Sequence, residues 1–357
     1  MPSTINKNFD IRQTNIAKGL ACLFLLWHHL FFDSTKDYEL FAPIVTTSSG
    51  KPVACIIAAI CKVCVAMFLI LSGYGMNCVL NNNVNPDCLM KSSINISLKQ
   101  LWKLWANYIF IFVLFVPWQF IFNHMPYTCW QDCVVDILGV SYIFLGKHTM
   151  NATWWYMSIA ILSYIVTPIF YFLFNKNRGL TIILMVTAMG LFAQVSYIYW
   201  VVFYFCGFIL CEYRYFDIIA SWYTKMKALK IIGMIACIGL IIYFRRLYNP
   251  LVLDLPLAVI MITLSYLFLS KIKLISGIFG FIGKHSGNIF MFHTFIYYYD
   301  FQSIIYAPRY SPLIFLLLLL ICLGVSVLIE ILKKSILFSK FVEYVGNSIV
   351  SPKRSQN

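Results

Sequence analysis

Long apolar stretches alternate with short polar segments along almost the whole chain. A helix needs about 20 mostly apolar residues to cross the hydrocarbon core of a bilayer. Ten segments meet or approach that length, so the pattern predicts ten membrane-spanning helices. They are expected at 14–32, 58–80, 104–123, 153–174, 180–197, 199–212, 229–244, 251–270, 288–306 and 311–332.

One further apolar piece, Val134 to Leu145, is too short to span and is expected to be re-entrant or to lie on the membrane surface. The first apolar segment is long and lacks a small-residue cleavage site, so we expect a retained helix rather than a signal peptide. No linker divides the chain. We therefore expect one membrane domain over 1–340 and a cytoplasmic tail over 341–357.

The distribution of basic residues predicts the orientation. An even number of spans places both termini on one side. With both termini cytoplasmic, the inner segments hold 20 Lys and Arg residues, the outer segments hold 6, and Lys62 lies inside a span. Cytoplasmic loops of membrane proteins are enriched in Lys and Arg. The sequence thus predicts an all-α polytopic membrane protein, with about ten transmembrane helices in one bundle and both termini cytoplasmic.

Composition agrees with that fold class. The chain is 61% hydrophobic and 11% charged, whereas a soluble domain carries about 25% charged residues. The net charge of +14 does not indicate nucleic-acid binding, because no long basic block is present and the positive-inside bias accounts for the excess. The loops leave no room for a soluble catalytic domain, so any chemistry is expected within the bundle or at its faces.

Most of the 12 cysteines lie in apolar runs, where a thiol acts as a small hydrophobic group. Cys61 and Cys64 form a C-x-x-C pair without a second pair, which favours packing over metal binding. No metal site is expected. Cys129 and Cys133 lie in a polar loop and are a conceivable disulfide pair.

The first predicted helix carries ionisable residues at both ends. Lys18 and His29 are 11 residues apart, so they share a helical face about 16 Å apart along the axis. Asp33 lies one turn further and is placed to orient the His29 ring. His28 points about 100° away. The alternative interpretation is a snorkelling lysine with two interfacial histidines.

The second predicted helix contains the run Ser72-Gly73-Tyr74. Small residues allow helices to approach closely, and packing is the simplest interpretation of this run. The surroundings of Ser72 do not match the G-x-S-x-G pattern of a nucleophilic serine. Lys62 lies upstream in the same segment and is a candidate partner for a buried carboxylate or an anion.

Two groups near the outer loops are candidates for acceptor binding. Trp154, Trp155 and Tyr156 open the fourth predicted helix and form either an aromatic belt or a platform for sugar rings. Arg245 and Arg246 lie together on the predicted outer side, against the topological trend. A pair of arginines suits a phosphate or carboxylate.

Near the end of the chain, the run "FIGKHSGNIFMFHTF" leads into an apolar segment that contains His293. A histidine in an apolar span indicates either a functional site or a hydrogen bond between helices.

Together these motifs resemble acyltransferase family 3, a family of integral-membrane acyltransferases that modify polysaccharides and other cell-surface molecules. The resemblance covers nearly the whole chain. It rests on four features in chain order. The first is a basic residue and a His eleven positions apart, Lys18 and His29, and the second is a Phe-Ser-Gly-Tyr group, Phe68 with Ser72 to Tyr74. The third is a Trp-aromatic pair, in Trp154 to Tyr156, and the fourth is a G-[KR]-x-S-x-x-[IL]-[YF]-x-x-H run from Gly283 to His293.

The resemblance implies transfer of an acyl group, usually acetyl, from cytoplasmic acyl-CoA to a hydroxyl of a cell-surface or lipid-linked polysaccharide such as a capsule. The acyl-CoA is then a co-substrate, and no tightly bound cofactor is expected. A bacterial plasma membrane is the expected location. The expected roles are catalysis by His29 and Asp33, donor binding by Lys18, Ser72 and Tyr74, and acceptor binding by Trp154, Trp155, Tyr156, Arg245 and Arg246, with His28, Lys62 and His293 as further site candidates.

Two departures from the family pattern matter. The family often has Arg where this chain has Lys18, and Lys keeps the charge but loses the bidentate fork. We also expect no esterase-like domain of the kind some relatives carry. A transporter or flippase for a lipid-linked sugar is the alternative from another class, although no pair of broken helices or inverted repeat supports it. A non-catalytic protein with the same fold is a third possibility, and the oligomeric state is left open.

Overall fold

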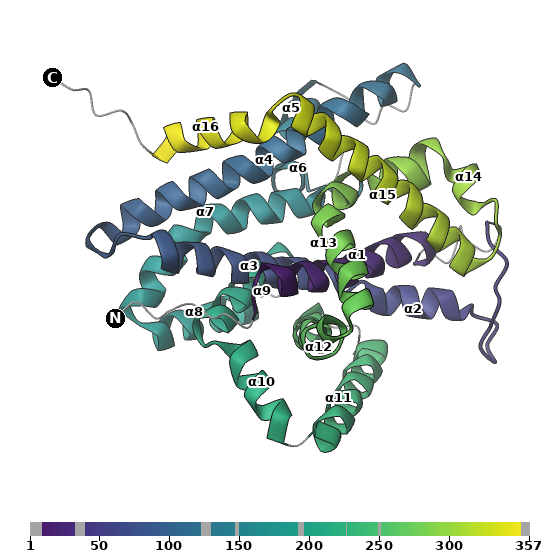
Figure 1. Ribbon diagram of the computed structural model, residues 1–357, viewed down its shortest axis with the longest axis horizontal. Helices are drawn as coiled ribbons and strands as arrows, with labels where there is room; N and C mark the ends of the chain where they lie inside the picture. The colour runs from purple at the N-terminus through teal and green to yellow at the C-terminus, as the bar shows by residue number, and fades with distance from the viewer. Residues whose placement is uncertain are drawn as a thin grey trace. The chain divides into compact units, whose positions relative to one another are not determined.

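The computed structural model describes residues 9–32, 40–122, 130–146, 150–191, 196–225, 227–248 and 251–350. These residues are mostly helical (Figure 1), and none of them belongs to a β-strand. Two isolated bridges, Ala42 with Tyr310 and Thr46 with Pro52, are present in the loops. The all-α prediction is confirmed.

The helices run in the following order, with three 3₁₀ turns (η1 to η3) and one π-helical segment (η4). They are α1 (Ile11–Phe31), α2 (Val53–Cys61), α3 (Cys64–Asn83), η1 (Pro86–Cys88), α4 (Leu89–Ile121), α5 (Trp130–Ile137), α6 (Ser141–Leu145), α7 (Trp155–Lys176), α8 (Arg178–Leu191), α9 (Ser196–Glu212), α10 (Tyr215–Lys225), α11 (Lys227–Tyr248), η2 (Leu251–Leu253), α12 (Asp254–Leu267), η3 (Leu269–Lys271), α13 (Lys273–Thr294), η4 (Phe295–Asp300), α14 (Gln302–Tyr306), α15 (Ser311–Ser335) and α16 (Phe338–Val350).

Each of the ten predicted segments overlaps a helix, but the number of membrane spans is not confirmed. Within the described residues, five helical stretches are long and apolar enough to cross a bilayer: 53–83, 86–121, 155–176, 251–271 and 311–335. α8 has 14 residues and is therefore only about 21 Å long. α1 carries Arg12, Lys18 and two histidines, which lower its hydropathy. The ten-span count and the cytoplasmic location of the termini remain predictions.

Two predicted segments have different boundaries in the structure. The segment 58–80 is divided into α2 and α3 by a turn at Lys62 and Val63. The segment 288–306 begins too late, because α13 starts at Lys273 and is followed by η4 and α14. The first half of α13 contains three glycines, Gly277, Gly280 and Gly283, which weaken a helix signal in the sequence. Packing against α1 provides the compensating stability.

The apolar piece Val134 to Leu145 forms parts of α5 and α6, which are separated by a turn at Gly139. The positive φ of Gly139, +74°, suits a glycine because a side chain is strained in this region. Both helices are too short to span a bilayer, as expected for this piece.

The chain forms two compact units. The first comprises Met1–Asn77 and Phe203–Gly324, and the second comprises Cys78–Val202 and Val325–Asn357. In the first unit α1 packs against α13, and the two ribbons cross in Figure 1. A Cβ atom on Gly19 would collide with the carbonyl of Phe279, and one on Gly283 would collide with the carbonyl of Asn15. Glycine at both positions therefore permits backbone-to-backbone contact between α1 and α13.

A second close helix pair in the first unit joins α3 and α9. A Cβ atom on Gly73 would collide with the carbonyl of Tyr204, and one on Gly207 would collide with the carbonyl of Ile70. The buried Asn77 amide donates to the carbonyl of Phe208 (3.3 Å), which adds a polar contact to this helix pair. The small-residue prediction for the Ser72-Gly73 pair is confirmed for Gly73.

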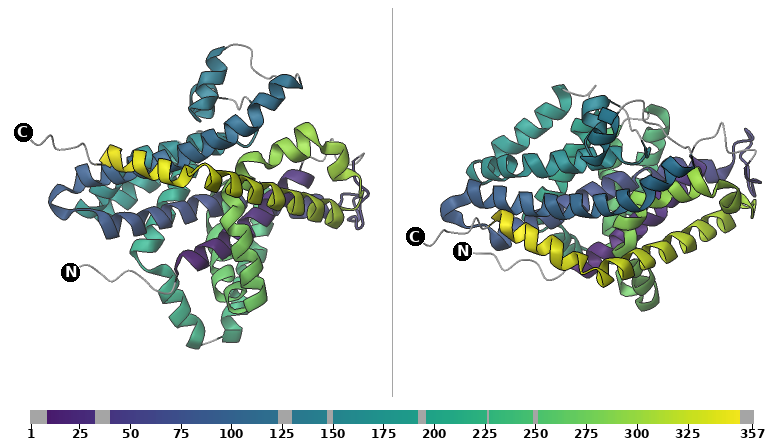
Figure 2. Two further views of the ribbon diagram at one scale, coloured as in Figure 1. Left: turned by 45° about the horizontal axis from the view of Figure 1, so that its top comes forward. Right: turned by 90° about the horizontal axis from the view of Figure 1, so that it is seen from above.

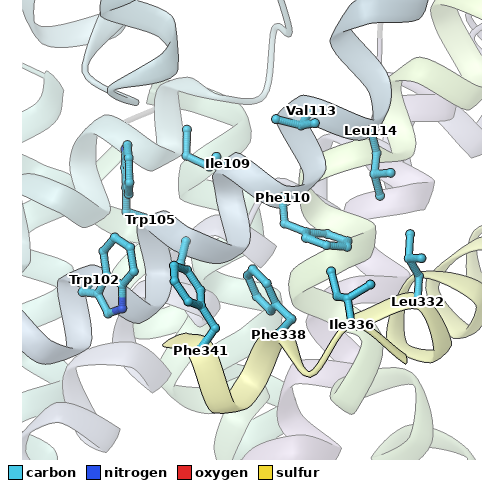
Figure 3. Close-up of a pocket in the computed structure, with 11 residues that line it drawn as sticks. Trp102, Trp105, Ile109, Phe110, Val113, Leu114, Leu332, Ile336, Phe338 and Phe341 are labelled. Atoms are coloured by element: carbon cyan, nitrogen blue, oxygen red, sulfur yellow. The ribbon is translucent and has the colours of Figure 1, made fainter. Parts of the chain in front are cut away.

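In the second unit α4 packs against α7, and the last helix, α16, lies along α4 (Figure 2). The indole of Trp102 on α4 donates to the carbonyl of Val342 on α16 (2.9 Å), and the ammonium of Lys99 donates to Asn347 (2.6 Å). An apolar groove with a volume of about 270 Å³ lies between α4 and the end of the chain (Figure 3). Most of α16 lies in the segment 341–357 that was expected to be a cytoplasmic tail. The boundary between domain and tail remains a prediction.

Candidate active site

His29 and His293 come together where α1 packs on α13. Their ring centroids lie 5.0 Å apart, with the ring planes inclined by 53°. His29 is half-buried in the last turns of α1, and His293 is fully buried. The glycine contacts at Gly19 and Gly283 bring the two helices close enough for this pairing. Two ionisable rings that the sequence places far apart therefore form one site.

Hydrogen bonds determine the tautomer of His293. Its Nδ1 atom lies 2.9 Å from the carbonyl oxygen of Ile289 and 3.1 Å from that of Phe290. A carbonyl oxygen only accepts, so Nδ1 must carry the proton, and in the neutral ring Nε2 keeps its lone pair. Nε2 is buried and bonds to no residue that the structure describes. It is a hydrogen-bond acceptor held beside His29.

Tyr297 completes the group. Its ring stacks on His293 at 5.9 Å and 15°, and its centroid lies 6.3 Å from that of His29. Tyr297 belongs to η4, the π-helical segment that follows α13 directly. Such segments occur frequently at functional sites, because the extra residue changes the direction of the side chains that follow. His29, His293 and Tyr297 are called the histidine cluster below.

The neighbouring His28 has a different role in the structure. Its Nδ1 atom donates to the carbonyl of Ala58 on α2 (2.8 Å), and Trp27 likewise donates to Ala54 (3.1 Å). On the other side of α1, the hydroxyl of Tyr306 donates to the carbonyl of Leu30 (2.9 Å). The C-terminal turn of α1, which carries His29, is thus bonded to both α2 and α14.

Lys18 lies on the same unbroken helix as His29. α1 is continuous from Ile11 to Phe31, so the 11-residue spacing places both side chains on one face, about 16 Å apart along the axis. Lys18 is half-buried. Asp33, the expected partner of His29, lies outside the described residues.

The donor candidates on α3 have contrasting surroundings. Tyr74 is buried, with its ring 5.1 Å from Phe9 and 5.5 Å from Phe216, in an aromatic cluster of the first unit. Ser72 is half-buried. Lys62 stands at the break between α2 and α3, and its carbonyl accepts a bond from the Cys64 thiol (3.8 Å). The structure brings none of these three side chains into the histidine cluster as defined above.

The acceptor candidates Trp154, Trp155 and Tyr156 belong to the second unit. Trp154 is only 1% exposed and packs against Tyr108 (4.9 Å) and Phe112 (5.5 Å). Trp155 is half-buried, and its ring lies 5.9 Å from that of Tyr142 and 5.3 Å from that of Trp200. Tyr156 is buried.

Arg245 and Arg246 lie on α11, and the described structure does not include their side chains. Of the two expected acceptor groups, only the aromatic one can therefore be placed.

Sequence reasoning missed three polar residues in or near the helices of the first unit. Asp254 is 1% exposed in the first turn of α12, where a negative charge interacts favourably with the helix dipole. Asn77 is fully buried on α3, and Tyr297 joins the histidine cluster. A polar residue at the edge of an apolar segment was the available signal for Asp254. The position of Tyr297 depends on the π-helical segment, which the sequence does not reveal.

Cys61 and Cys64 are buried at the α2–α3 break, and no disulfide joins them. The described residues contain no group of three metal-ligating side chains. Cys129, half of the conceivable disulfide pair, lies outside them.

A family model described as an acyltransferase domain matches residues 11–331 of the chain. The match includes α1, α13 and all three residues of the histidine cluster. No curated protein and no solved structure matches the chain.

Proposed function

Because the chain belongs to acyltransferase family 3, we propose that it transfers an acyl group, most simply acetyl, from acyl-CoA to a hydroxyl of a cell-surface or lipid-linked polysaccharide. The family match establishes an acyltransferase, and the apolar helices indicate a membrane protein. The donor, the acceptor, the O-acyl linkage and a bacterial plasma membrane are parts of the proposal.

One observation carries the proposed mechanism: the half-buried His29 lies beside the tautomer-fixed His293. A sugar hydroxyl is a weak nucleophile and needs a base within hydrogen-bond distance as it attacks. His29 is half-buried whereas His293 is fully buried, and His29 is the proposed base. His293 presents a buried Nε2 acceptor beside it and is the proposed positioning residue for the His29 ring.

The chemical step follows from these positions. His29 removes the proton of the acceptor hydroxyl while the hydroxyl oxygen attacks the carbonyl carbon of the thioester. The new ester C–O bond forms, the C–S bond breaks, and the departing CoA sulfur takes the proton from His29. The products are the acylated glycan and free CoA. A covalent acyl-histidine intermediate is a less direct variant of the same reaction.

Lys18 is the proposed contact for the anionic part of the donor. It lies on the face of α1 that carries His29 and about 16 Å from it along the axis. A donor whose anionic part binds Lys18 would thus extend along α1, with its acyl group toward His29. Ser72 and Tyr74 are retained as donor-binding proposals.

On the acceptor side, Trp155 is the favoured proposal among the three aromatic residues, because Trp154 and Tyr156 are buried. Arg245 and Arg246 are proposed for an anionic group of the glycan. Asp33 remains the proposed orienting partner of His29.

The test is acyl transfer by the purified protein in lipid nanodiscs, supplied with acetyl-CoA labelled in the acetyl group and with the surface glycan of the source cell. Label is expected to move into the glycan as an alkali-labile ester. His29→Ala is expected to lower this rate by about 10²–10⁴-fold. The control is His285→Ala, a histidine of α13 outside the histidine cluster.

Transfer at the wild-type rate by a correctly inserted His29→Ala protein would rule out His29 as the base. Movement of an unmodified lipid-linked glycan across the membrane, without label on the glycan, would favour the transporter alternative.

A further inference from the structure

The main chain of α1 and α13 presents no hydrogen-bond donors to the histidine cluster. Only the first four N–H groups of a helix lack a partner within the helix. α1 begins at Ile11 and α13 begins at Lys273, so His29 and His293 lie many residues beyond those donors. His29 is instead in the last turn of α1, where carbonyl groups form the negative end of the helix dipole.

This arrangement has opposite effects on the two charges that develop in the proposed acyl transfer. His29 becomes positive when it takes the proton of the acceptor hydroxyl, and the negative end of the α1 dipole stabilises that charge. The carbonyl oxygen of the thioester becomes negative when the hydroxyl oxygen attacks. Enzymes stabilise such an oxyanion with hydrogen-bond donors that are aimed at it in advance. Because the main chain of α1 and α13 supplies none, a side-chain donor is expected beside His29.

Four side chains around His29 use their donors on backbone carbonyls. Nδ1 of His293 bonds two carbonyls of its own helix. Nδ1 of His28 and the indole of Trp27 each bond a carbonyl of α2, and the hydroxyl of Tyr306 bonds a carbonyl of α1. These donors stabilise contacts within and between helices.

Tyr297, the third member of the histidine cluster, lies against both histidines. Its ring stacks on His293 with 5.9 Å between centroids and 15° between planes, and its centroid lies 6.3 Å from that of His29. Tyr297 is only 9% exposed, and a hydrogen bond is stronger where water is largely excluded. A phenolic hydroxyl rotates to suit its partner, so Tyr297 can direct its proton to a substrate oxygen bound beside His29.

We propose that Tyr297 is a second catalytic residue, whose hydroxyl donates a hydrogen bond to the oxyanion that forms from the thioester carbonyl oxygen. The acceptor oxygen bonds to the carbonyl carbon while His29 takes the acceptor proton. The oxyanion then reverts to a carbonyl, the C–S bond breaks, and the CoA sulfur takes the proton from His29. The Tyr297 proton stays on its own oxygen throughout. This role rests on the proposed acyl-transfer function and adds a catalytic group to it.

Tyr297→Phe tests the proposal, because it removes the hydroxyl and keeps the ring that stacks on His293. We expect kcat to fall by about 10²–10³-fold, the usual cost of removing one oxyanion donor. KM for acyl-CoA and KM for the glycan should stay nearly unchanged, because this hydrogen bond is strong only in the transition state. The assay is transfer of labelled acetyl in nanodiscs, and thermal unfolding of the same samples reports the stability of the fold.

Two further variants separate the hydroxyl from the ring and from general effects. Tyr298→Phe removes a hydroxyl from the next residue of η4, which is 44% exposed and whose ring centroid lies 6.2 Å from that of Tyr297. It is expected to retain wild-type kinetics and stability. Tyr297→Leu removes both the ring and the hydroxyl, and it is expected to lose at least as much kcat as Tyr297→Phe and to unfold at a lower temperature.

Wild-type kcat in Tyr297→Phe, with a loss in Tyr297→Leu, would show that Tyr297 only holds the His293 ring and would overturn the proposal. A melting temperature of Tyr297→Phe several degrees below wild type would assign the hydroxyl to the stability of the fold, with the same consequence. An equal fall in kcat for Tyr298→Phe would also overturn it. No transfer by the wild-type protein is a distinguishable result, because it overturns the proposed function together with this role.

Discussion

The His29 ring on α1 lies 5.0 Å from the His293 ring on α13, centroid to centroid, although the two residues are near opposite ends of the chain. Nδ1 of His293 is committed to two backbone carbonyls, so its Nε2 atom is the one that can act on a neighbour. The two nitrogens of this ring therefore differ in hydrogen bonding. This difference can be tested by replacing them separately.

His293→Asn retains an amide N–H near the position of Nδ1 and removes Nε2. We expect kcat to fall by about 5–100-fold, because the Nε2 acceptor proposed to position the His29 ring during the reaction is removed, and a hydrogen bond formed there at a buried site is worth about 1–3 kcal/mol. His293→Gln can place an amide oxygen near the position of Nε2, and we expect it to recover most of that loss. Steady-state kinetics, with KM for acyl-CoA and for glycan measured separately, is the readout. If His293 only stabilises the fold through its Nδ1 bonds, His293→Asn should keep its activity and His293→Gln should lose it.

Gly283 and Gly287 lie one turn apart on α13 and separate a packing effect from helix propensity. A Cβ atom on Gly283 would collide with the backbone of Asn15, which cannot move without separating α1 from α13. We expect Gly283→Ala to lower stability by about 1–3 kcal/mol and the melting temperature by several degrees. The measurement is thermal unfolding in nanodiscs, together with acyl transfer.

Gly287→Ala is the control, because no atom lies within 4 Å of the added Cβ. Here we expect unchanged or slightly raised stability, since Ala favours a helix over Gly by about 1 kcal/mol. The packing explanation fails if Gly283→Ala is as stable as Gly287→Ala.

Lys18→Met removes the positive charge from the inner part of α1 while keeping an unbranched side chain. If Lys18 binds the anionic donor, we expect KM for acyl-CoA to rise about 10–100-fold, because a hydrogen bond to a charged group contributes about 1.5–3 kcal/mol. KM for the glycan should remain the same. Lys18→Arg should preserve donor binding, in keeping with the family pattern at this position.

The same kinetic assay includes Lys273→Met, which removes an exposed lysine at the start of α13. An unchanged KM for acyl-CoA in Lys18→Met would show that Lys18 does not bind the donor and serves only as an anchor at the membrane interface.

Trp154 and Trp155 are adjacent but should respond differently to truncation. Trp154→Ala empties a buried site between Tyr108 and Phe112, and we expect a loss of about 3–5 kcal/mol in stability. Trp155→Ala should raise KM for the glycan several-fold with a smaller effect on stability, because Trp155 is half-buried whereas Trp154 is fully buried. Thermal unfolding and glycan titration distinguish the two effects. If Trp154→Ala and Trp155→Ala lose stability equally and neither changes KM for the glycan, both residues serve only to stabilise the fold.

The sequence predicted the helical class, and each of its ten apolar segments overlaps a helix, because long apolar runs are visible without a structure. The number of membrane spans remains a prediction. The sequence also identified His29 and His293 as candidates, because an ionisable side chain in an apolar segment is costly. It did not identify the start of α13. The glycines of 273–287 weaken that signal, and they are tolerated because Gly283 permits contact with α1.

The sequence motifs also did not separate packing from chemistry. In the Ser72-Gly73-Tyr74 run, Gly73 packs α3 against α9 and Tyr74 joins an aromatic cluster, so at least two of the three residues stabilise helix contacts. In the Trp154–Tyr156 run, two of the three side chains are buried. Spacing along a chain shows which residues share a helix face, but it does not show what lies opposite that face.

By itself the sequence determined an all-α chain, its membrane-protein class and the Lys18–His29 face of α1, since these depend on local composition and helical periodicity. The tertiary structure decided that His293 and Tyr297 join His29 and that α16 returns along α4 to form a groove. Those features arise from contacts between distant segments. They require backbone approach at particular glycines, a π-helical segment after α13 and a left-handed residue at Leu337, none of which an apolar pattern specifies.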